Sequence, residues 1–502
     1  MTSYRSGCVA SPHHLASEAG LAVLRSGGNA VDAAVATNLA LSVLTPYSCG
    51  PGGDLFAMVW DGSLHAFEGA GATAAAAAGA PGPFDGDAAT VPGAVDGWFA
   101  LLDRFGSRSF EELWTHVRPL AVEGFPVSPH AMDLLAPSLA RLRARPEWAR
   151  VFGGLRAGDV LRQPDLARTF DRLAGEGPDP FYRGEIAAAI VEALRTEGGR
   201  MAVEDLVGHR GQWVEPLSVR YRDAEVFELP PPTQGVTALE ALRIVDRLGP
   251  LPEPGDRREH RLIEAIRAAL HDRAAHVTDP RRMRIDPGAL LEDARVAERA
   301  AAIDDDRAAV WPPARPVPGG TVYLCAADAG GMLVSLIQSN FMSFGTGITV
   351  PGWGVTLNNR ASLSWAEPEA ADAFAPGKKP LHTLIPAMAF RDGRPWLVFG
   401  TMGGDGQAQI HVQLLAGILD DGLGVQDAID RPRWIVSPAT WEVAVESRVP
   451  AETVAGLERR GHRVHTLGPF EHRMGHAHAV ELTEEGYVPA TDPRTEGAAL
   501  GR

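Results

Sequence analysis

The 502-residue chain has few cysteines, no long apolar run and no excess of basic residues. Its three cysteines, Cys8, Cys49 and Cys325, lack CxxC spacing, so the sequence predicts neither a disulfide framework nor a zinc site. No run of roughly 18 apolar residues is present, which argues against a membrane span. The amino terminus, MTSYRSGCVASPHH, has no apolar core after a basic start and is unlike a secretory signal. We therefore expect a cytoplasmic protein with no membrane partner.

The charge balance excludes another class of partner. Lys and Arg number 47 against 63 Asp and Glu, which gives a formal net charge of −16. A chain with this net charge repels a phosphate backbone, so we expect no nucleic-acid partner. The sequence also has no GK[ST] loop and no dinucleotide fingerprint, and we expect no cofactor.

The first part of the chain is mainly helical in pattern. Apolar residues recur at helical spacing between Leu15 and Leu44, and Ser-Gly-Gly-Asn at 26–29 divides this run into two helices, with Asn29 as the cap of the second. Amphipathic segments continue from about residue 95 to 273. The proline-rich, charged stretch 286–318 predicts a mobile connector.

After Gly319 the pattern changes to strands. TVYLCAAD and MLVSLIQSN predict two strands around a turn at Asp328–Gly331, and several further strand-like segments follow. Helices in the first half and strands in the second fit a layered α/β sandwich whose sheets are packed inside helices.

Thr321 stands at the start of the first of these strands, directly after Gly319 and Gly320. A β-branched threonine favours a strand, and this alone would explain it. Alternatively, its hydroxyl attacks the carbonyl of Gly320, and the chain breaks to leave Thr321 with a free α-amino group. Such an amine, with an ordinary pKa of about 7.7–8.0, can act as the general base for its own hydroxyl.

A nucleophile of this kind needs hydrogen-bond donors for the oxyanion that it creates. Gly403 and Gly404 lie between an apolar strand and a helix in FGTMGGDGQAQIHVQLL. Backbone N–H groups at such a junction can point outward, and glycines allow a substrate to approach. The same residues are also compatible with a plain tight turn.

Together these motifs resemble the γ-glutamyltransferase family of N-terminal-nucleophile hydrolases. The resemblance runs in family order along almost the whole chain. It rests on ASEAGLAVLRSGGNAVDAAVAT (16–37), CGPGGDLF (49–56), VPGAVDGW (91–98), QPDLARTF (163–170), VEPLSVRYR (214–222), PPPTQG (230–235), TVYLCAADAGG (321–331), FGTG (344–347), LNN (357–359), TMGGDGQ (401–407) and DPRTEGAA (492–499).

The resemblance implies a four-layer αββα sandwich and a proenzyme that cuts itself between Gly320 and Thr321. Residues 1–320 would form the large subunit and 321–502 the small one, intertwined in one globular unit. The mature protein would be a heterodimer of these two products, and a dimer of such heterodimers stays open. The resemblance places Thr321 as nucleophile, Ser339 as a hydroxyl that hydrogen-bonds it, and Gly403 and Gly404 as the oxyanion glycines.

The substrate pocket departs from the family pattern. Ala70 stands where the family has an arginine for the substrate carboxylate, and an alanine cannot bind a carboxylate. The family's Gln and Asp after LNN are replaced by Arg360 and Leu363, which removes the acidic partner of the substrate ammonium. A site without these anchors should reject a γ-glutamyl group, so glutathione is not the expected substrate.

Other pocket positions carry polar groups of a different kind. His382 and Thr383 replace the family's paired serines, and Asn340 and Asn359 complete the predicted substrate-binding set. The cation of Arg360 indicates a small acidic substrate, such as an oxalyl, oxamate-like or dicarboxylic acyl group, although a structural ion pair is the alternative. His382 is equally compatible with a pocket group and with a core histidine.

We interpret the chain as an autoprocessing hydrolase that cleaves an amide bond through an acyl-enzyme on Thr321. Hydrolysis of a carbon–carbon bond beside an oxalyl-type carbonyl, as in family members of alkylproline antibiotic pathways, is one alternative. A non-catalytic binding relative is another. The histidines of EHRMGHAHAV, His472, His476 and His478, suggest metal binding, but a similar run is structural in the family, and we predict no metal site.

Overall fold

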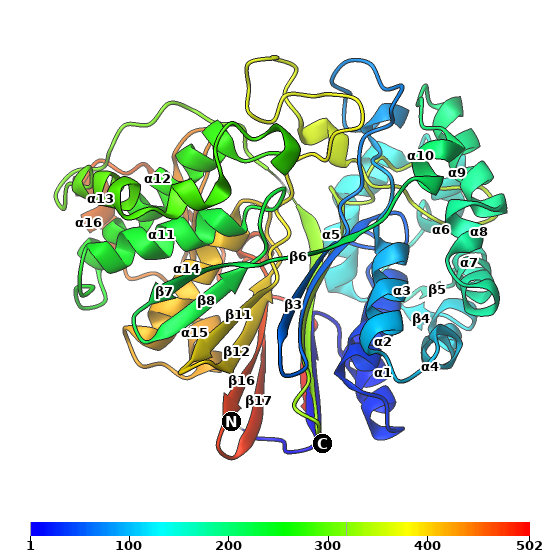
Figure 1. The fold of residues 1–502 in the computed structure, drawn as a ribbon, viewed down its shortest axis with the longest axis horizontal. Coiled ribbons are helices and arrows are strands. Elements are labelled where there is room, and N and C mark those ends of the chain that lie inside the picture. Colours follow the sequence, from blue (N-terminus) through cyan, green and yellow to red (C-terminus); the bar gives the residue numbers. More distant parts are fainter. Residues whose placement is uncertain (1, 318) are drawn as a thin grey trace.

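Two β-sheets pack face to face at the centre of the computed structural model, with helices on both sides of the pair (Figure 1). The structure describes residues 2–317 and 319–502. Met1 and Pro318, the last residue of the predicted connector, lie outside it. The mixed α/β class predicted from the sequence is confirmed.

The first sheet has seven strands, each antiparallel to its neighbours, in the order β18-β1-β9-β10-β2-β3-β6. Its strands are β1 (Gly7–Ser11), β2 (Asp54–Trp60), β3 (Leu64–Glu68), β6 (Gln212–Val214), β9 (Gly320–Asp328), β10 (Leu333–Phe341) and β18 (Ala498–Gly501). The bond between Gly320 and Thr321 therefore lies at the start of a strand in the middle of this sheet.

The second sheet has six strands, again antiparallel, in the order β17-β16-β12-β11-β8-β7. These are β7 (Leu217–Tyr221), β8 (Ala224–Glu228), β11 (Ala387–Arg391), β12 (Arg394–Thr401), β16 (Ala477–Thr483) and β17 (Gly486–Thr491). Two smaller sheets comprise β13 (Trp434–Val436), β14 (Val443–Glu446) and β15 (Val464–Leu467), and β4 (Phe125–Pro126) and β5 (Val160–Leu161). Each large sheet thus combines strands that precede Thr321 with strands that follow it.

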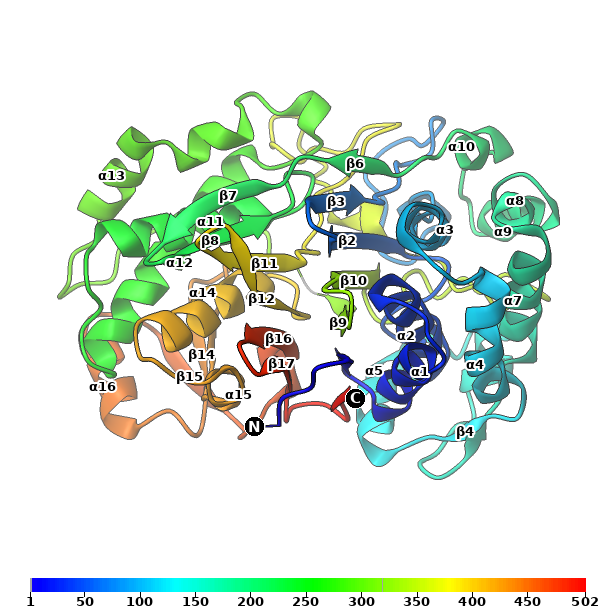
Figure 2. The ribbon, with the colours of Figure 1, turned by 60° about the horizontal axis from the view of Figure 1, so that its bottom comes forward.

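The helices form two groups, one beside each large sheet (Figures 1 and 2). Beside the first sheet lie α1 (His14–Arg25), α2 (Ala30–Leu44), α3 (Ala94–Phe105), α4 (Phe110–Val122), α5 (Pro129–Leu142), α6 (Pro146–Phe152), α7 (Pro164–Glu176), α8 (Asp179–Tyr182), α9 (Glu185–Thr196) and α10 (Val203–Val207). Beside the second lie α11 (Gly235–Arg247), α12 (Asp256–His276), α13 (Asp293–Ala301), α14 (Gly406–Leu419), α15 (Val425–Asp430) and α16 (Ala451–Arg459).

Alternation along the strands explains this layering. Val322 and Leu324 of β9 pack toward the helices of the first group, whereas Tyr323 and Cys325 pack between the two sheets. Successive strand side chains point to opposite faces, so a strand covered on both faces must be apolar at both parities. The run TVYLCAA satisfies this condition, because all of its residues are buried.

Several local predictions are confirmed. The helical run at 15–44 is divided into α1 and α2, and Asn29 caps α2 through a reciprocal capping box with Asp32. The two strands predicted around Asp328–Gly331 are β9 and β10. Across the described residues, no helix has both the length and the apolar character that crossing a membrane requires.

The predicted connector over 286–318 is partly wrong. Residues Pro287–Leu291 form a 3₁₀ turn and Asp293–Ala301 form α13, which contacts α11. Val296 and Ala300 lie four residues apart on α13 and are buried. This narrow apolar face is hidden in the sequence by the charged residues around it.

Candidate active site

Thr321 and Ser339 lie opposite each other at the ends of β9 and β10. A shift of register between Gln338 and Phe341 forms a bulge in β10, and Phe341 has a left-handed φ of 74°, which is unusual for a large side chain. A bulge re-aims the side chains of its strand. Here Ser339 lies within the bulge and its side chain reaches both the start of β9 and its own backbone.

The Ser339 hydroxyl connects the predicted nucleophile to the bond before it. Thr321 Oγ1 donates to Ser339 Oγ at 3.2 Å, and Ser339 Oγ donates to the carbonyl oxygen of Gly320 at 2.5 Å. The backbone N–H of Phe341 donates to Ser339 Oγ at 2.8 Å and fixes the serine rotamer. The Thr321 hydroxyl, the Ser339 hydroxyl and the Gly320 carbonyl are therefore hydrogen-bonded in series.

A cavity of about 160 Å³ opens beside Thr321. Its polar lining includes His13, Tyr47, His130, His476 and Glu496. Burial lowers the pKa of His476 to about 3 and that of His13 to about 4, so both imidazoles are neutral near pH 7. The cavity wall beside Thr321 thus combines two neutral imidazoles with the carboxyl group of Glu496.

Gly403 and Gly404 occupy the loop between β12 and α14, as predicted. Both have positive φ, 139° and 57°, which favours glycine at these positions. The loop closely approaches the residue before the candidate cleavage site, because a Cβ added to Gly319 would lie 2.9 Å from the Gly404 nitrogen. Within the described part of the chain, neither glycine N–H donates a hydrogen bond. The described residues therefore supply no acceptor for these two N–H groups.

Arg360 is completely buried and forms a long ion pair with the buried carboxylate of Asp54, as the structural alternative predicts. Its Nε lies 4.0 Å from Asp54 Oδ2, and its guanidinium carbon lies 4.3 Å from the centre of the Phe341 ring. Among the described residues, none of its three side-chain nitrogens has a hydrogen-bond partner. Burial lowers its pKa to about 10, so it remains a cation at neutral pH. A buried cation with unused donors is suited to an anionic ligand.

His382 and Arg360 converge on the same carboxylate. His382 Nε2 lies 3.1 Å from Asp54 Oδ2, and its Nδ1 lies 2.8 Å from the Pro380 carbonyl oxygen. Asp54 itself was not singled out from the sequence. Its motif, CGPGGDLF, was recognised, but its role follows from pairing with Ser339 across β2 and β10, which no local pattern reveals.

The remaining predicted pocket residues differ in how their side chains are used. Asn359 binds backbone at both ends of its amide, accepting from Met342 N–H and donating to the Pro83 carbonyl, which supports a structural role. Asn340 Oδ1 and Thr383 Oγ1 are buried without a partner in the described chain. These two atoms are available to a ligand.

At two positions where the sequence departs from the family pattern, the structure has buried apolar side chains. Ala70 is fully buried between the sheets, and Leu363 is buried against the second group of helices. Neither side chain carries a charge or a hydrogen-bonding group that could anchor a γ-glutamyl group.

The catalytic pair and the Arg360 group adjoin each other. Phe341, which lies under the Arg360 guanidinium, pairs with Gly320, and Asp54 pairs with Ser339. Gln234 Nε2 joins the carbonyl oxygens of Thr383 and Gly404 at 3.1 and 2.9 Å. The predicted residues therefore lie around one end of β9 and β10, but the cavity beside Thr321 is not lined by Asn340, Asn359, Arg360, His382 or Thr383.

A possible metal-ligand group lies elsewhere. In the described part of the chain, the one group of three spaced to hold an ion is His260, Glu264 and His462. The ring nitrogens of the two histidines are 2.7 Å apart, a hydrogen-bonding distance, and Arg267 occupies a carboxylate oxygen of Glu264. The hydrogen bonds of His260, Glu264 and His462 therefore form a buried polar network within the protein.

Comparison with known proteins identifies the family. The model of the γ-glutamyltranspeptidase family matches residues 16–502, and the chain belongs to this family of enzymes as a hydrolase or acyltransferase. The non-catalytic alternative is therefore not supported.

Similar curated proteins are proenzymes. The oxamate amidohydrolase proenzyme of Klebsiella pneumoniae is 36% identical, with 99% of this chain and 98% of that protein covered. The glutathione hydrolase-like YwrD proenzyme of Bacillus subtilis is 35% identical, with 98% of each covered. Among solved structures, cephalosporin acylase from Bacillus halodurans has a TM-score of 0.95 and 34% identity, covering 100% of this chain and 96% of that one.

Proposed function

We propose that the chain is a proenzyme that cleaves itself between Gly320 and Thr321, and that the mature enzyme hydrolyses the amide of a small acidic acyl group. The observation that carries the proposal is the hydrogen-bonded series from Thr321 through Ser339 to the Gly320 carbonyl. Residues 1–320 and 321–502 would be the two subunits. The order of helices, sheet, sheet and helices supports the four-layer αββα sandwich of N-terminal-nucleophile hydrolases.

In self-cleavage, Thr321 Oγ attacks the carbonyl carbon of Gly320. The developing negative charge on the Gly320 oxygen is stabilised by the Ser339 hydroxyl, which already donates to that atom. The hydroxyl proton of Thr321 passes to its own backbone nitrogen as the C–N bond breaks, giving an ester between Gly320 and Thr321 Oγ and a free α-amine. Water hydrolyses the ester and leaves a carboxylate on Gly320.

In turnover, the α-amine of Thr321 takes the proton of its own hydroxyl, which attacks the substrate amide carbonyl. The N–H groups of Gly403 and Gly404 would stabilise the oxyanion, because both lack an acceptor in the described chain and the Gly404 nitrogen lies near Gly319. The α-amine then passes this proton to the nitrogen of the substrate amide, which leaves as the free amine or ammonia. Water, activated by the same α-amine, then releases the acid.

The acyl group is assigned from the charge of the pocket. Arg360 supplies buried donors for a carboxylate, and its stacking on Phe341 places it beside the strand position of Gly320. A compact substrate with a carboxylate next to its amide fits this proximity. Oxamate has this form, and the Klebsiella relative carries an oxamate amidohydrolase name, which supports the proposal. The buried Ala70 and Leu363 argue against γ-glutamyl compounds.

The proposal is tested first by analysing the fragments of the protein and then by assaying its substrates. We expect the wild-type protein to yield two fragments, the smaller with Thr321 at its amino terminus by mass spectrometry, whereas Thr321→Ala stays a single chain of 53.4 kDa. Thr321→Ser, which keeps a hydroxyl, should still mature. The mature enzyme should release ammonia and oxalate from oxamate and little glutamate from glutathione. An intact wild-type chain would overturn the maturation step, and efficient glutathione hydrolysis would overturn the acyl assignment.

A further inference from the structure

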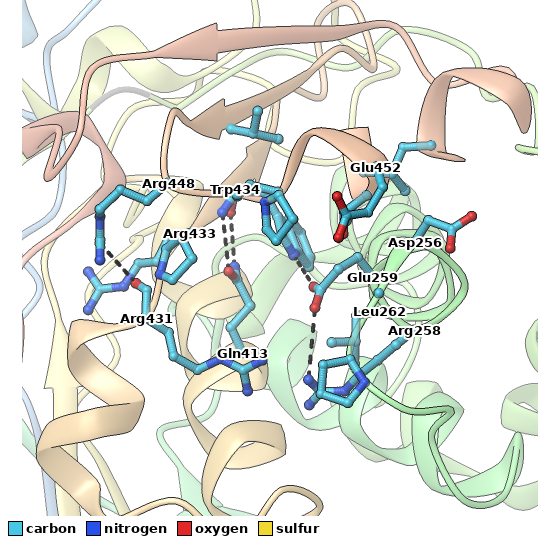
Figure 3. A pocket seen from close by; sticks show the side chains of 18 of the residues that line it. Asp256, Arg258, Glu259, Leu262, Gln413, Arg431, Arg433, Trp434, Arg448 and Glu452 are labelled. Carbon is cyan, nitrogen blue, oxygen red and sulfur yellow. Dashed lines mark hydrogen bonds and ion pairs between the residues drawn. The ribbon is translucent and has the colours of Figure 1, made fainter. Parts of the chain in front are cut away.

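A second, larger cavity lies away from the catalytic residues, among α12, α14, α15, α16 and strands β13 and β14 (Figure 3). Its volume is about 530 Å³, which is within the range of small-molecule sites. Thr321, Arg360 and His382 do not line it. Ile410 of α14 is its wall residue nearest to the glycine loop, with Cδ1 3.7 Å from a Cβ added to Gly403.

The walls of this cavity combine buried apolar side chains with charged ones. Leu262, Leu414, Val445 and Leu457 line it and are each at most 2% exposed. Trp434 adds an aromatic face, and its indole N–H donates to Glu259 at 2.7 Å. Its backbone is held by Gln413, which both donates to and accepts from it (Figure 3). The cavity therefore has the apolar lining and rigid polar supports of a binding site.

Positive charge outnumbers negative charge around the cavity. On one side, Arg258 pairs with both Asp421 and Glu259, and Asp421 also pairs with Arg431. On the other side, Glu446 and Asp492 form ion pairs with the three guanidiniums of Arg433, Arg494 and Arg448. Among the lining residues, the five arginines Arg258, Arg431, Arg433, Arg448 and Arg459 outnumber the three acids Asp256, Glu259 and Glu452, which favours an added anion.

Two of the lining arginines also keep unused donors. Within the described residues, Nε of Arg258 and Nε of Arg448 are buried without a hydrogen-bond partner. The Arg258 side chain is 2% exposed, so water does not compensate for the missing bond. An acid group that reaches either nitrogen would gain a charge-assisted hydrogen bond.

We propose that this cavity binds a small organic monocarboxylate with an apolar or aromatic body. The carboxylate would face the arginines, and the body would lie against Trp434 and the leucine and valine walls. The volume separates this ligand from the substrate of the catalytic site, because an acid of two carbons would leave most of the cavity empty. The site is independent of the nucleophile and of self-cleavage.

Isothermal titration calorimetry with 2-naphthoate tests the proposal, with 2-naphthylmethanol as the neutral analogue of the same shape. We expect one saturable site for 2-naphthoate per chain and at least tenfold weaker binding of the alcohol. Arg448→Met, which keeps the apolar stem, should weaken naphthoate binding at least tenfold. Val449→Trp, which fills the cavity from a partly buried lining position, should abolish it.

Two control variants locate the bound acid. Arg360→Met removes the cation of the catalytic pocket, and Arg463→Met removes an exposed arginine outside the cavity. Neither should change the affinity for 2-naphthoate by more than twofold. Equal binding of acid and alcohol, absence of naphthoate binding, or unchanged binding in both Arg448→Met and Val449→Trp would each overturn the proposal. Loss of binding in Arg360→Met would also overturn it, because the acid would then occupy the catalytic pocket.

Discussion

Two groups of buried polar side chains meet at the start of β9, and they use their hydrogen bonds differently. In the first, the Ser339 hydroxyl is bonded to Thr321, Gly320 and Phe341. In the second, the Arg360 guanidinium and the Thr383 hydroxyl have no partner in the described chain. Unpartnered buried donors cost free energy, whereas a satisfied network does not. The hydrogen bonds of the first group are therefore complete within the described chain, and those of the second are not.

The largest effect should come from removing the Ser339 hydroxyl, which lies at the centre of the first group. Ser339→Ala takes away the donor to the Gly320 carbonyl, and loss of one oxyanion donor typically slows a reaction about 100-fold or more. We expect self-cleavage to slow by this factor, measured as fragment appearance on denaturing gels.

Ser335→Ala is the matched control for this change. Ser335 lies on the same strand and is equally buried, but it binds Tyr323 and the Phe399 carbonyl instead of the cleavage site. Self-cleavage should continue at close to the wild-type rate in this variant. Equal rates in Ser339→Ala and Ser335→Ala would remove Ser339 from the mechanism.

The second group is tested by Arg360→Met. A hydrogen bond to a charged group is worth about 1.5–3 kcal/mol, so kcat/KM for oxamate should fall about tenfold to 150-fold. Because Arg360 does not touch Thr321 or Ser339, self-cleavage should be unchanged. Arg360→Lys, which keeps a cation but not the planar fork, should recover part of the loss. Impaired self-cleavage in Arg360→Met would show that the two groups are not separable.

The pH dependence of KM and kcat should distinguish the two groups through a smaller effect. Burial lowers the pKa of Arg360 to about 10, and the guanidinium is cationic below this pKa and neutral above it. KM for oxamate should therefore be flat up to about pH 9 and then rise by about tenfold per unit above pH 10. The α-amine of Thr321 acts in the opposite range, because it must be unprotonated, so kcat should fall as the pH drops below about 8. The rise in KM should be absent in Arg360→Met.

The two groups also differ in how far the sequence predicts them. The pattern of glycines, a threonine and an apolar strand places Thr321 at the head of β9, and the family motifs place Ser339 opposite it. The carboxylate of Asp54 escapes this reasoning, because it reaches Arg360 and His382 only through the pairing of β2 with β10. Helix α13 escapes for a different reason, since only two of its side chains are buried.

The smallest effect should separate an unused hydroxyl from a used one. Thr383 Oγ1 is buried without a partner among the described residues, so replacing it with a methyl in Thr383→Val removes no internal hydrogen bond. We expect an unchanged or higher unfolding midpoint, with kcat/KM for oxamate lowered about threefold to tenfold through the loss of one neutral hydrogen bond to the substrate.

Thr346 is the matched comparison, because its hydroxyl is also buried but donates to the Leu357 carbonyl and accepts from the Ile348 N–H, at 3.0 and 3.1 Å. Thr346→Val leaves both of these backbone groups without the hydroxyl, and should cost about 1–3 kcal/mol of stability in a denaturant titration while retaining kcat/KM. If Thr383→Val were as destabilising as Thr346→Val and left oxamate hydrolysis intact, the Thr383 hydroxyl would serve the fold. The incomplete group would then consist of Arg360 alone.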